Sequence, residues 1–121
     1  MAELRQPPSI DAYGGGGFRV SGRRLEGSLL ILNDIPQAWP VASLADLGPA
    51  DIQAVLDAGI GQVEFLLLGV GARVAPPPPA LRKALQDAGM GLEVMDTATA
   101  ARVYNVLVSE GRRLAAALIA I

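Results

Sequence analysis

Two short apolar runs, at residues 29–32 and 63–68, constrain the fold of this 121-residue chain more than any other feature. The first run reads LLIL, and the second reads VEFLLL. Apolar runs of this length are typical of strands that are buried on both faces of a sheet. Residues 49–59 lie between them and repeat apolar residues at helical spacing. The sequence therefore predicts an α/β domain with a mixed sheet.

The segments around these runs continue an alternation of strands and helices. Four prolines at residues 76–79 form a stiff spacer, and only the last of them can open a helix. The only tryptophan, Trp39, is expected to cover the edge of the core. The expected elements are an antiparallel hairpin (18–20 with 27–32), a long connection (33–49), a helix (49–59), a strand (63–68), a helix (79–89), a strand (91–95) and a long helix (98–120).

The last predicted helix, at residues 98–120, has one apolar face and one polar stripe. On a wheel of about 100° per residue, Gly111 lies at the centre of the apolar face. Glycine inside a helix costs about 0.5–1 kcal/mol relative to alanine, so we expect a close approach to another element at this position. The stripe contains Arg102, Asn105, Ser109, Arg112 and Arg113.

The chain contains no His and no Cys. This composition removes imidazole acid–base chemistry, thiolate nucleophiles, disulfides and the usual zinc sites. The only lysine is Lys83, and no pair of carboxylates has a recognisable catalytic spacing. We therefore predict no cofactor, no metal and no catalytic residue, and an enzyme is the less favoured class.

The charge and hydropathy of the chain restrict its partners. Ten basic and twelve acidic residues give a net charge of −2, which argues against nucleic acid. No apolar segment approaches the about 20 residues of a membrane-spanning helix, and the first residues, MAELRQPP, carry no secretory signal. We expect a cytoplasmic protein without a transmembrane segment. Because 51% of the residues are hydrophobic and 18% are charged, we also expect either an unusually apolar core or a surface that pairs with a partner, which could be a second copy of the chain.

Two short motifs follow successive predicted strands, where ligands of open α/β sheets bind. Gly69 and Gly71 follow the first of these strands, and Asp96 and Thr97 follow the second. The glycines fail as a dinucleotide fingerprint, because Val74 stands where the third glycine is required. The structural alternatives are a tight turn for the glycines, a helix N-cap for Asp96 and Thr97, and a solvated face for the arginine stripe.

Seven features of the sequence, in one order, resemble a known protein family. They are IDAYG from residue 10, GFRV from residue 17, GSLLIL from residue 27, Trp39, LLLGVG from residue 66, MDT from residue 95 and AARVYNVLVSEGRR from residue 100. Over residues 10–119 the chain resembles the small domain family of unknown function that includes mitochondrial respiratory complex I (NADH dehydrogenase) assembly factor three and an adipogenesis-associated vertebrate protein.

The resemblance implies a single three-layer α/β domain, with a central mixed β-sheet flanked by helices and a small N-terminal β-hairpin element. This domain would occupy residues 10–121, after an irregular lead-in at residues 1–9. The resemblance also implies a bacterial cytoplasmic protein whose biochemical activity is not established. It places around one cleft the ligand-binding candidates Gly69, Gly71, Asp96, Thr97, Asn105, Glu110 and Arg112.

Two functions from different classes remain open on the sequence. The first is a non-catalytic interaction or assembly-factor-like domain with an unidentified protein partner, such as a membrane-associated complex. The alternative is a small-molecule binding protein or slow enzyme, which would hold an anionic ligand in a cleft at the carboxyl-terminal edge of the strands.

Overall fold

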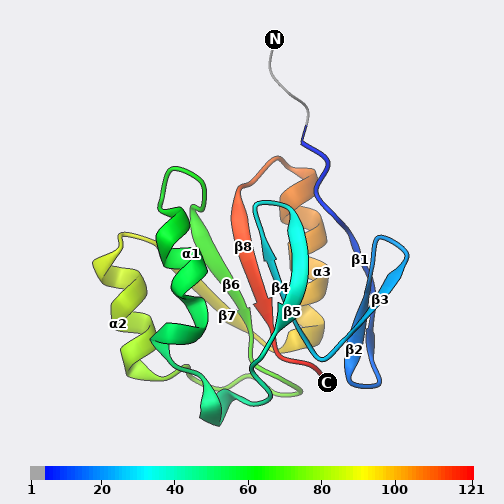
Figure 1. Ribbon diagram of the computed structural model, residues 1–121, viewed down its shortest axis with the longest axis horizontal. Coiled ribbons are helices and arrows are strands. Elements are labelled where there is room, and N and C mark those ends of the chain that lie inside the picture. Colours follow the sequence, from blue (N-terminus) through cyan, green and yellow to red (C-terminus); the bar gives the residue numbers. More distant parts are fainter. Residues whose placement is uncertain (1–4) are drawn as a thin grey trace.

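A computed structural model describes residues 5–121, which form two β-sheets flanked by helices (Figure 1). The strand order is β5-β4-β8-β6-β7 in the larger sheet and β1-β2-β3 in the smaller one. The strands are β1 (Ile10–Gly14), β2 (Gly17–Val20), β3 (Arg23–Glu26), β4 (Ser28–Leu32), β5 (Ile35–Trp39), β6 (Phe65–Gly69), β7 (Gly91–Met95) and β8 (Leu114–Leu118). The helices are α1 (Gln53–Ala58), α2 (Pro79–Asp87) and α3 (Thr97–Ser109), with two 3-10 turns, η1 (Leu44–Asp46) and η2 (Pro49–Ile52).

The five-stranded sheet is mixed, which confirms the predicted fold class. Strand β6 pairs in parallel with β7 and β8, whereas β4 is antiparallel to β5 and β8. We call the end of this sheet at which β6, β7 and β8 begin the amino edge. The end at which these three strands finish is the carboxyl edge. Because β4 runs the other way, it finishes at the amino edge, where the hairpin turn into β5 lies (Figure 1).

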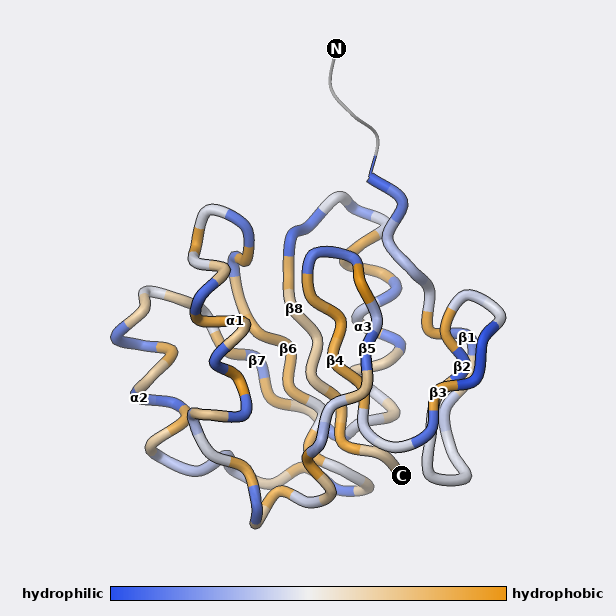
Figure 2. Tube along the Cα trace, viewed as in Figure 1, coloured by the Kyte–Doolittle hydropathy of each residue, from blue (hydrophilic) through white to orange (hydrophobic). Residues whose placement is uncertain are grey.

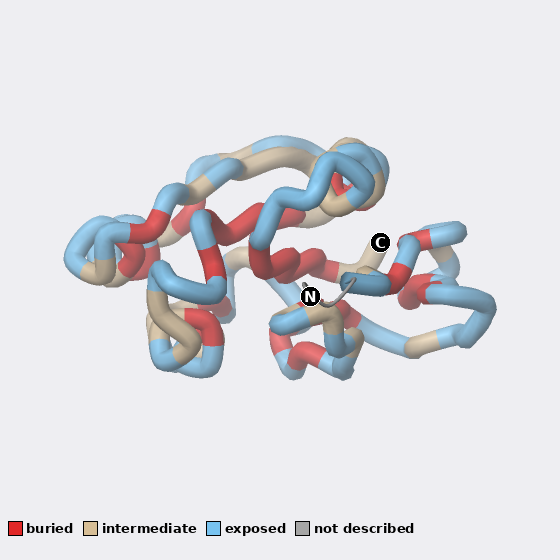
Figure 3. The backbone as a smooth tube through the Cα atoms, turned by 90° about the horizontal axis from the view of Figure 1, so that it is seen from above, coloured by how far each residue is buried: buried red, intermediate tan, exposed pale blue. Residues whose placement is uncertain are grey.

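The larger sheet is the middle of three layers. On β6, Leu66 and Leu68 join the core on the side of α1 and α2, whereas Phe65 and Leu67 join the core on the side of α3 and the smaller sheet. This alternation follows from the two-residue period of a strand. Burial of each leucine side chain stabilises the fold by about 1.5–3 kcal/mol. Figure 3 shows the buried residues in the interior, with exposed segments around them.

The predicted helix at residues 98–120 is wrong over its second half. Helix α3 covers Thr97–Ser109, and Leu114–Leu118 form β8, which lies between β4 and β6 at the centre of the sheet. Every residue of β8 is buried. Alanine has the highest helix propensity, but this segment has no polar side to expose. The residues of β8 are coloured as apolar along the strand (Figure 2). A central strand buries both of its faces, so tertiary packing decides the conformation.

Gly111 ends α3 rather than packing inside it. Its φ is +81°, its N–H donates to Val108 O at 3.0 Å, and the N–H of Arg112 donates to Leu107 O at 3.1 Å. These two bonds form a Schellman motif, in which glycine takes the left-handed position after the helix. A Cβ built at Gly111 would meet nothing within 4 Å, so the predicted close approach at this glycine is wrong.

The N-terminal strands pair differently from the prediction. Strand β2 contains the predicted segment 18–20, but its partners are β1 and β3 in the smaller antiparallel sheet. The apolar segment 27–32 instead contains β4 of the larger sheet, with β5 as a partner. The expected long connection at residues 33–49 therefore begins with a strand. Asn33 and Asp34, with φ of +52° and +64°, form the two-residue hairpin turn that joins β4 to β5.

The other predicted elements are confirmed. The helical segment from Pro49 starts as η2 and continues as α1 up to Gly59, and α2 starts at Pro79. The strand at residues 91–95 is β7. Trp39 is buried, and its Nε1 donates to Asp51 O at 2.8 Å, so it covers the core as expected.

The predicted irregular lead-in lies partly outside the described residues, which begin at residue 5. Residues 5–9 contain no helix or strand. Several contacts hold this segment against the domain; among them, the buried Tyr104 hydroxyl donates to Pro8 O at 2.8 Å, and Arg5 pairs with Asp34 at 2.9 Å. Burial raises the pKa of Tyr104, which therefore stays a hydrogen-bond donor at neutral pH.

Candidate functional site

Four of the predicted ligand-binding residues, Gly69, Gly71, Asp96 and Thr97, lie together at the carboxyl edge. The hydroxyl of Thr97 accepts from the N–H of Gly71 at 3.0 Å and donates to Ile119 O at 2.7 Å. The N–H of Thr97 donates to Gly71 O at 2.8 Å. Thr97 is completely buried. These bonds join the ends of β6 and β8 to the start of α3.

Gly69 allows β6 and the start of α3 to approach closely. A Cβ at this position would lie 2.7 Å from Leu118 Cδ2 and 3.1 Å from both Cα and Oγ1 of Thr97. The last two contacts involve backbone and a hydroxyl that is already held by two bonds. The space beside Gly69 is therefore filled by protein, and no room remains there for a ligand.

Asp96 is the N-cap of α3, as the sequence predicted. Its carboxylate accepts from the backbone N–H of Thr99 at 2.9 Å and from the Thr99 hydroxyl at 2.8 Å. These two bonds hold the pKa of Asp96 below its ordinary value, because they favour the ionised form. The carboxylate stabilises the helix start, which is the role of an N-cap.

Asn105 lies in the middle of α3 and binds the backbone of β1. Its side-chain oxygen accepts from Ile10 N at 2.9 Å, and its side-chain nitrogen donates to Ile10 O at 2.9 Å. The carboxamide thus acts as the partner that a neighbouring strand would otherwise supply. With Tyr104, it fastens the first strand and the segment before it to α3.

The last two predicted candidates, Glu110 and Arg112, lie at the amino edge. Glu110 is exposed at the end of α3. The Nε of Arg112 pairs with Glu64 Oε2 at 3.0 Å, and its guanidinium lies 5.2 Å from the centre of the Phe65 ring. Arg112 holds the pKa of Glu64 below its ordinary value through this hydrogen-bonded pair.

The structure therefore separates the seven candidates into three places. Phe65 and Gly69 stand at opposite ends of β6, about 13 Å apart at about 3.3 Å per residue. Arg112 contacts the first of these residues and Thr97 the second, so one cleft does not contain both. A ligand role for the seven residues stays a prediction from the resemblance.

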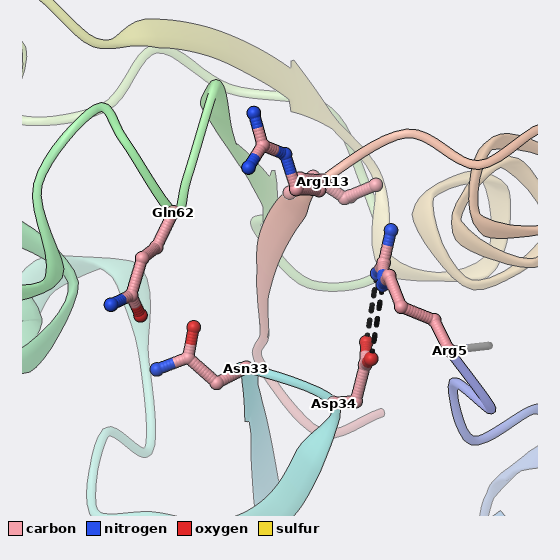
Figure 4. A pocket seen from close by; sticks show the side chains of 6 residues that line it. Arg5, Asn33, Asp34, Gln62 and Arg113 are labelled. Carbon is pink, nitrogen blue, oxygen red and sulfur yellow. Dashed lines mark hydrogen bonds and ion pairs between the residues drawn. The ribbon is translucent and has the colours of Figure 1, made fainter. Parts of the chain in front are cut away.

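A pocket at the amino edge contains polar side chains that the sequence analysis did not group. It has a volume of about 630 Å³ and lies between the β4–β5 turn, the loop before β6 and the start of β8 (Figure 4). We call it the amino-edge pocket. Its lining residues are Arg5, Asn33, Asp34, Gln62, Arg113 and Leu114.

One wall of the amino-edge pocket is a satisfied ion pair. Arg5 donates from Nε and Nη2 to the two carboxylate oxygens of Asp34 at 3.1 and 2.9 Å, and from Nη1 to Arg112 O at 3.0 Å. This two-pronged geometry is the strong form of an arginine–carboxylate pair. It raises the pKa of Arg5. Both charges are neutralised within the pair, and the carboxylate is not free to act as a base.

The rest of the lining carries polar groups with spare hydrogen-bonding capacity. The Nη1 of Arg113 donates to Gly61 O at 2.9 Å, which holds the side chain and leaves further N–H groups unused. Arg113 makes no salt bridge with the described residues. The carboxamides of Asn33 and Gln62 extend toward each other across the pocket, and neither bonds another group within residues 5–121 (Figure 4).

This arrangement offers groups that can bind a polar ligand. It offers N–H donors and amide oxygens, but its one carboxylate is paired, and it contains no hydroxyl nucleophile. No group of three or more acidic residues within residues 5–121 could hold a metal ion. In the same part of the chain, no helix is long and apolar enough to cross a membrane.

The sequence contained a partial signal for the amino-edge pocket. Asn-Asp directly after the apolar run at 29–32 is a pair that tolerates positive φ, and it marks a tight turn. Arg113 was assigned to a helical stripe and in fact precedes a strand. Arg5 and Gln62 come from segments with no pattern of their own, so only the folded chain brings them together.

Comparison with known proteins places these observations in a family. A family model described as "Protein of unknown function (DUF498/DUF598)" matches residues 10–119. An uncharacterized protein of Rhodobacter capsulatus is 46% identical over 91% of this chain and 82% of its own length. The NADH dehydrogenase [ubiquinone] 1 alpha subcomplex assembly factor 3 of Xenopus tropicalis is 33% identical over 91% of this chain, which spans 60% of that protein.

A solved structure confirms the similarity in three dimensions. The crystal structure of an outer membrane protein from Bartonella henselae matches with a TM-score of 0.88 and 33% identity, covering 94% of this chain and 95% of that one. The similarity therefore includes nearly the whole α/β domain, with both sheets.

Proposed function

Because the chain belongs to the DUF498/DUF598 family of proteins of unknown function, we propose that residues 10–121 act as one non-catalytic, assembly-factor-like interaction domain. The observation that carries this proposal is the similarity to assembly factor 3 along 91% of the chain. The partner would be a protein of a membrane-associated complex, with an NADH dehydrogenase as the first candidate. The chain matches about three fifths of that relative, so the partner is proposed from the shared domain alone.

The surface at the amino edge supports a role in binding protein. Ile35 directly follows the pocket residue Asp34 and is 60% exposed, and Ile60 lies two residues before Gln62 and is 59% exposed. Large apolar side chains beside a polar pocket are typical of surfaces that a partner covers. We propose these two isoleucines as contact residues.

Affinity capture from the organism that encodes the chain tests this function. The wild type is compared with an Ile35→Ser, Ile60→Ser double variant and with Val74→Ser, which removes an equally exposed valine from a loop at the carboxyl edge. We expect subunits of one membrane-associated complex on the wild type and on Val74→Ser, and at least about tenfold less on the double variant. Equal recovery on all three proteins, or none above background, would reject the proposal.

Deletion of the gene gives a second readout that does not depend on capture. An assembly role predicts less of the mature complex on a native gel and its recovery on re-expression of the wild type. We also propose that the protein is located in the cytoplasm, and cell fractionation in the same strains tests this location. Recovery of the protein in the outer-membrane fraction would contradict that location.

A further inference from the structure

We propose that the amino-edge pocket binds a carboxylate group, with Arg113 as the charged anchor and the carboxamides of Asn33 and Gln62 as polar contacts. This inference concerns a small-ligand site and is independent of the assembly-factor role. The carboxylate could come from a free carboxylic acid or from the C-terminus of a peptide, because both present the same two oxygens.

The charge of the pocket favours a monoanion. Arg5 and Asp34 neutralise each other through two hydrogen bonds, and the neighbouring pair of Arg112 with Glu64 is also neutral. Arg113 is left with one uncompensated positive charge. One guanidinium in this setting matches one carboxylate, since its planar fork can donate two parallel hydrogen bonds.

The charged anchor and the turn that carries Asn33 are held in place before any ligand arrives. Arg113 is fixed by its bond to Gly61 O, and its own carbonyl accepts from Glu64 N at 2.8 Å. Asn33 sits in the hairpin turn between β4 and β5, whose backbone conformation is set by two residues with positive φ. Little ordering of the Arg113 anchor is then required on binding, which favours affinity at a small site.

The spare hydrogen-bonding groups indicate what surrounds the carboxylate. Each carboxamide offers one N–H₂ and one oxygen, so together they can bind an amide or hydroxyl beside the acid. A pocket of about 630 Å³ has room for a molecule of several such groups. Leu114 supplies the apolar part of the lining.

A phosphate dianion fits these groups less well. Phosphate sites in proteins gather several cations or a row of backbone N–H groups. Here the lining offers one uncompensated guanidinium, that of Arg113, because the charge of Arg5 is already paired with Asp34. The lining is therefore expected to favour one negative charge on the ligand over two.

Titrations followed by two-dimensional amide NMR test the carboxylate site. The probes are N-acetyl-alanyl-alanine with a free carboxylate, the same dipeptide with a C-terminal amide, acetate and inorganic phosphate, each up to about 10 mM. We expect the dipeptide acid to shift the signals of Asn33, Gln62 and Leu114 and to bind at least about tenfold more tightly than its amide. Acetate binding as tightly as the dipeptide acid would indicate a free acid as ligand, and weaker acetate binding would indicate a peptide terminus.

Variants connect the binding to the proposed anchor. Arg113→Gln should weaken the dipeptide acid at least about tenfold, and Arg113→Lys should weaken it less, because lysine keeps the charge but loses the fork. Asn33→Asp, which has the same shape, should also weaken it. Arg82→Gln, an equal charge change on the exposed side of α2, should leave binding unchanged.

Three results would overturn the proposal. They are the absence of any shift in the pocket signals with either carboxylate, tighter binding of phosphate than of the dipeptide acid, and equal binding by wild type and Arg113→Gln. A thermal unfolding curve of each variant checks that it is folded. Success or failure in the capture experiment has no bearing on these titrations, so the two proposals stand or fall separately.

Discussion

The two ends of the central sheet use their polar groups in opposite ways. At the carboxyl edge, the hydroxyl of Thr97 is buried and bonds Gly71 N and Ile119 O, and Gly69 leaves no room for a Cβ. At the amino edge, Asn33, Gln62 and Arg113 surround an open pocket and keep unused hydrogen-bonding groups. The motif residues at the carboxyl edge thus stabilise the fold, whereas Asn33, Gln62 and Arg113 at the amino edge face solvent.

This difference shows why a motif at the expected edge of an α/β sheet is weak evidence for a site. Open sheets often bind ligands beyond the carboxyl ends of their strands. Here the turn after β6 is closed by the first turn of α3, which takes up the backbone groups that a ligand would bind. Polar groups with unused hydrogen-bonding capacity line the amino-edge pocket, at the other end of the sheet.

Thr97→Val should give the largest loss of stability and tests the closed edge directly. The substitution keeps the shape of the side chain but leaves Gly71 N and Ile119 O without their hydroxyl partner. A buried polar group without a partner costs about 1–3 kcal/mol, so we expect a loss of about 2–4 kcal/mol in the free energy of unfolding. Urea denaturation measures this loss.

Thr97→Ser is the matched control for that substitution. Serine keeps the hydroxyl and loses only a methyl group, so it should cost about 1 kcal/mol. A loss as large as that of Thr97→Val would show that the methyl group, and not the two hydrogen bonds, makes the position intolerant.

The same substitution at one glycine on each edge sharpens the comparison. Gly69→Ala should destabilise by about 1–3 kcal/mol, because its Cβ would lie 3.1 Å from Thr97 Cα. Gly61→Ala, beside the amino-edge pocket, meets nothing within 4 Å and should stay within about 0.5 kcal/mol of the wild type. Thermal unfolding of the two variants measures the difference, and equal melting temperatures would remove the distinction between the edges.

The middle of the chain was predictable because its local signals agree with its packing. The β6-α2-β7-α3 segment has apolar strands, a proline at the start of α2, and Asp96 at the N-cap of α3. The local conformation that each of these residues prefers agrees with the one it adopts in the folded domain. The order of strands and helices from residue 63 to residue 109 therefore follows from the sequence.

The last strand was not predictable from the same signals. Leu114–Leu118 contains three alanines, which favour a helix, and only the neighbours β4 and β6 provide the two buried faces that make it a strand. One local signal was available. Gly111 follows a helical pattern, and a glycine in this place is typical of a helix end.

The candidate site was the least predictable feature. The amino-edge pocket joins residues from four segments, and the Arg5–Asp34 pair alone spans 29 positions. No spacing in the sequence connects such residues. The resemblance identified Thr97 and Asn105 as part of a family pattern, and the structure gives both a packing role: each satisfies backbone groups of a distant segment.

The acid limb of the stability curve tests the role of Asp96 at the closed edge. The pKa of its carboxyl group is below the ordinary value of 3.8, so its contribution to stability is present above that pH and is lost as the pH falls through the lower folded value. The carboxamide of an Asp96→Asn variant can still cap the helix but does not titrate. We expect the wild type to be the more stable protein at pH 7 and the difference between the two proteins to shrink as the pH falls through the folded pKa of Asp96. A constant difference between them would show that the carboxylate charge has no part in the cap.

The smallest effect is expected at the open edge, where Arg113→Gln should leave the free energy of unfolding within about 0.5 kcal/mol of the wild type. Arg113 is exposed, and its one bond is to the exposed loop at Gly61, so little of the fold depends on it. Urea denaturation in low and high salt measures the effect. A loss of more than about 1.5 kcal/mol would show that Arg113 has a structural role like that of Thr97. The contrast between a carboxyl edge that stabilises the fold and an amino edge that does not would then be wrong. A small loss combined with weaker carboxylate binding would separate function from stability at this position.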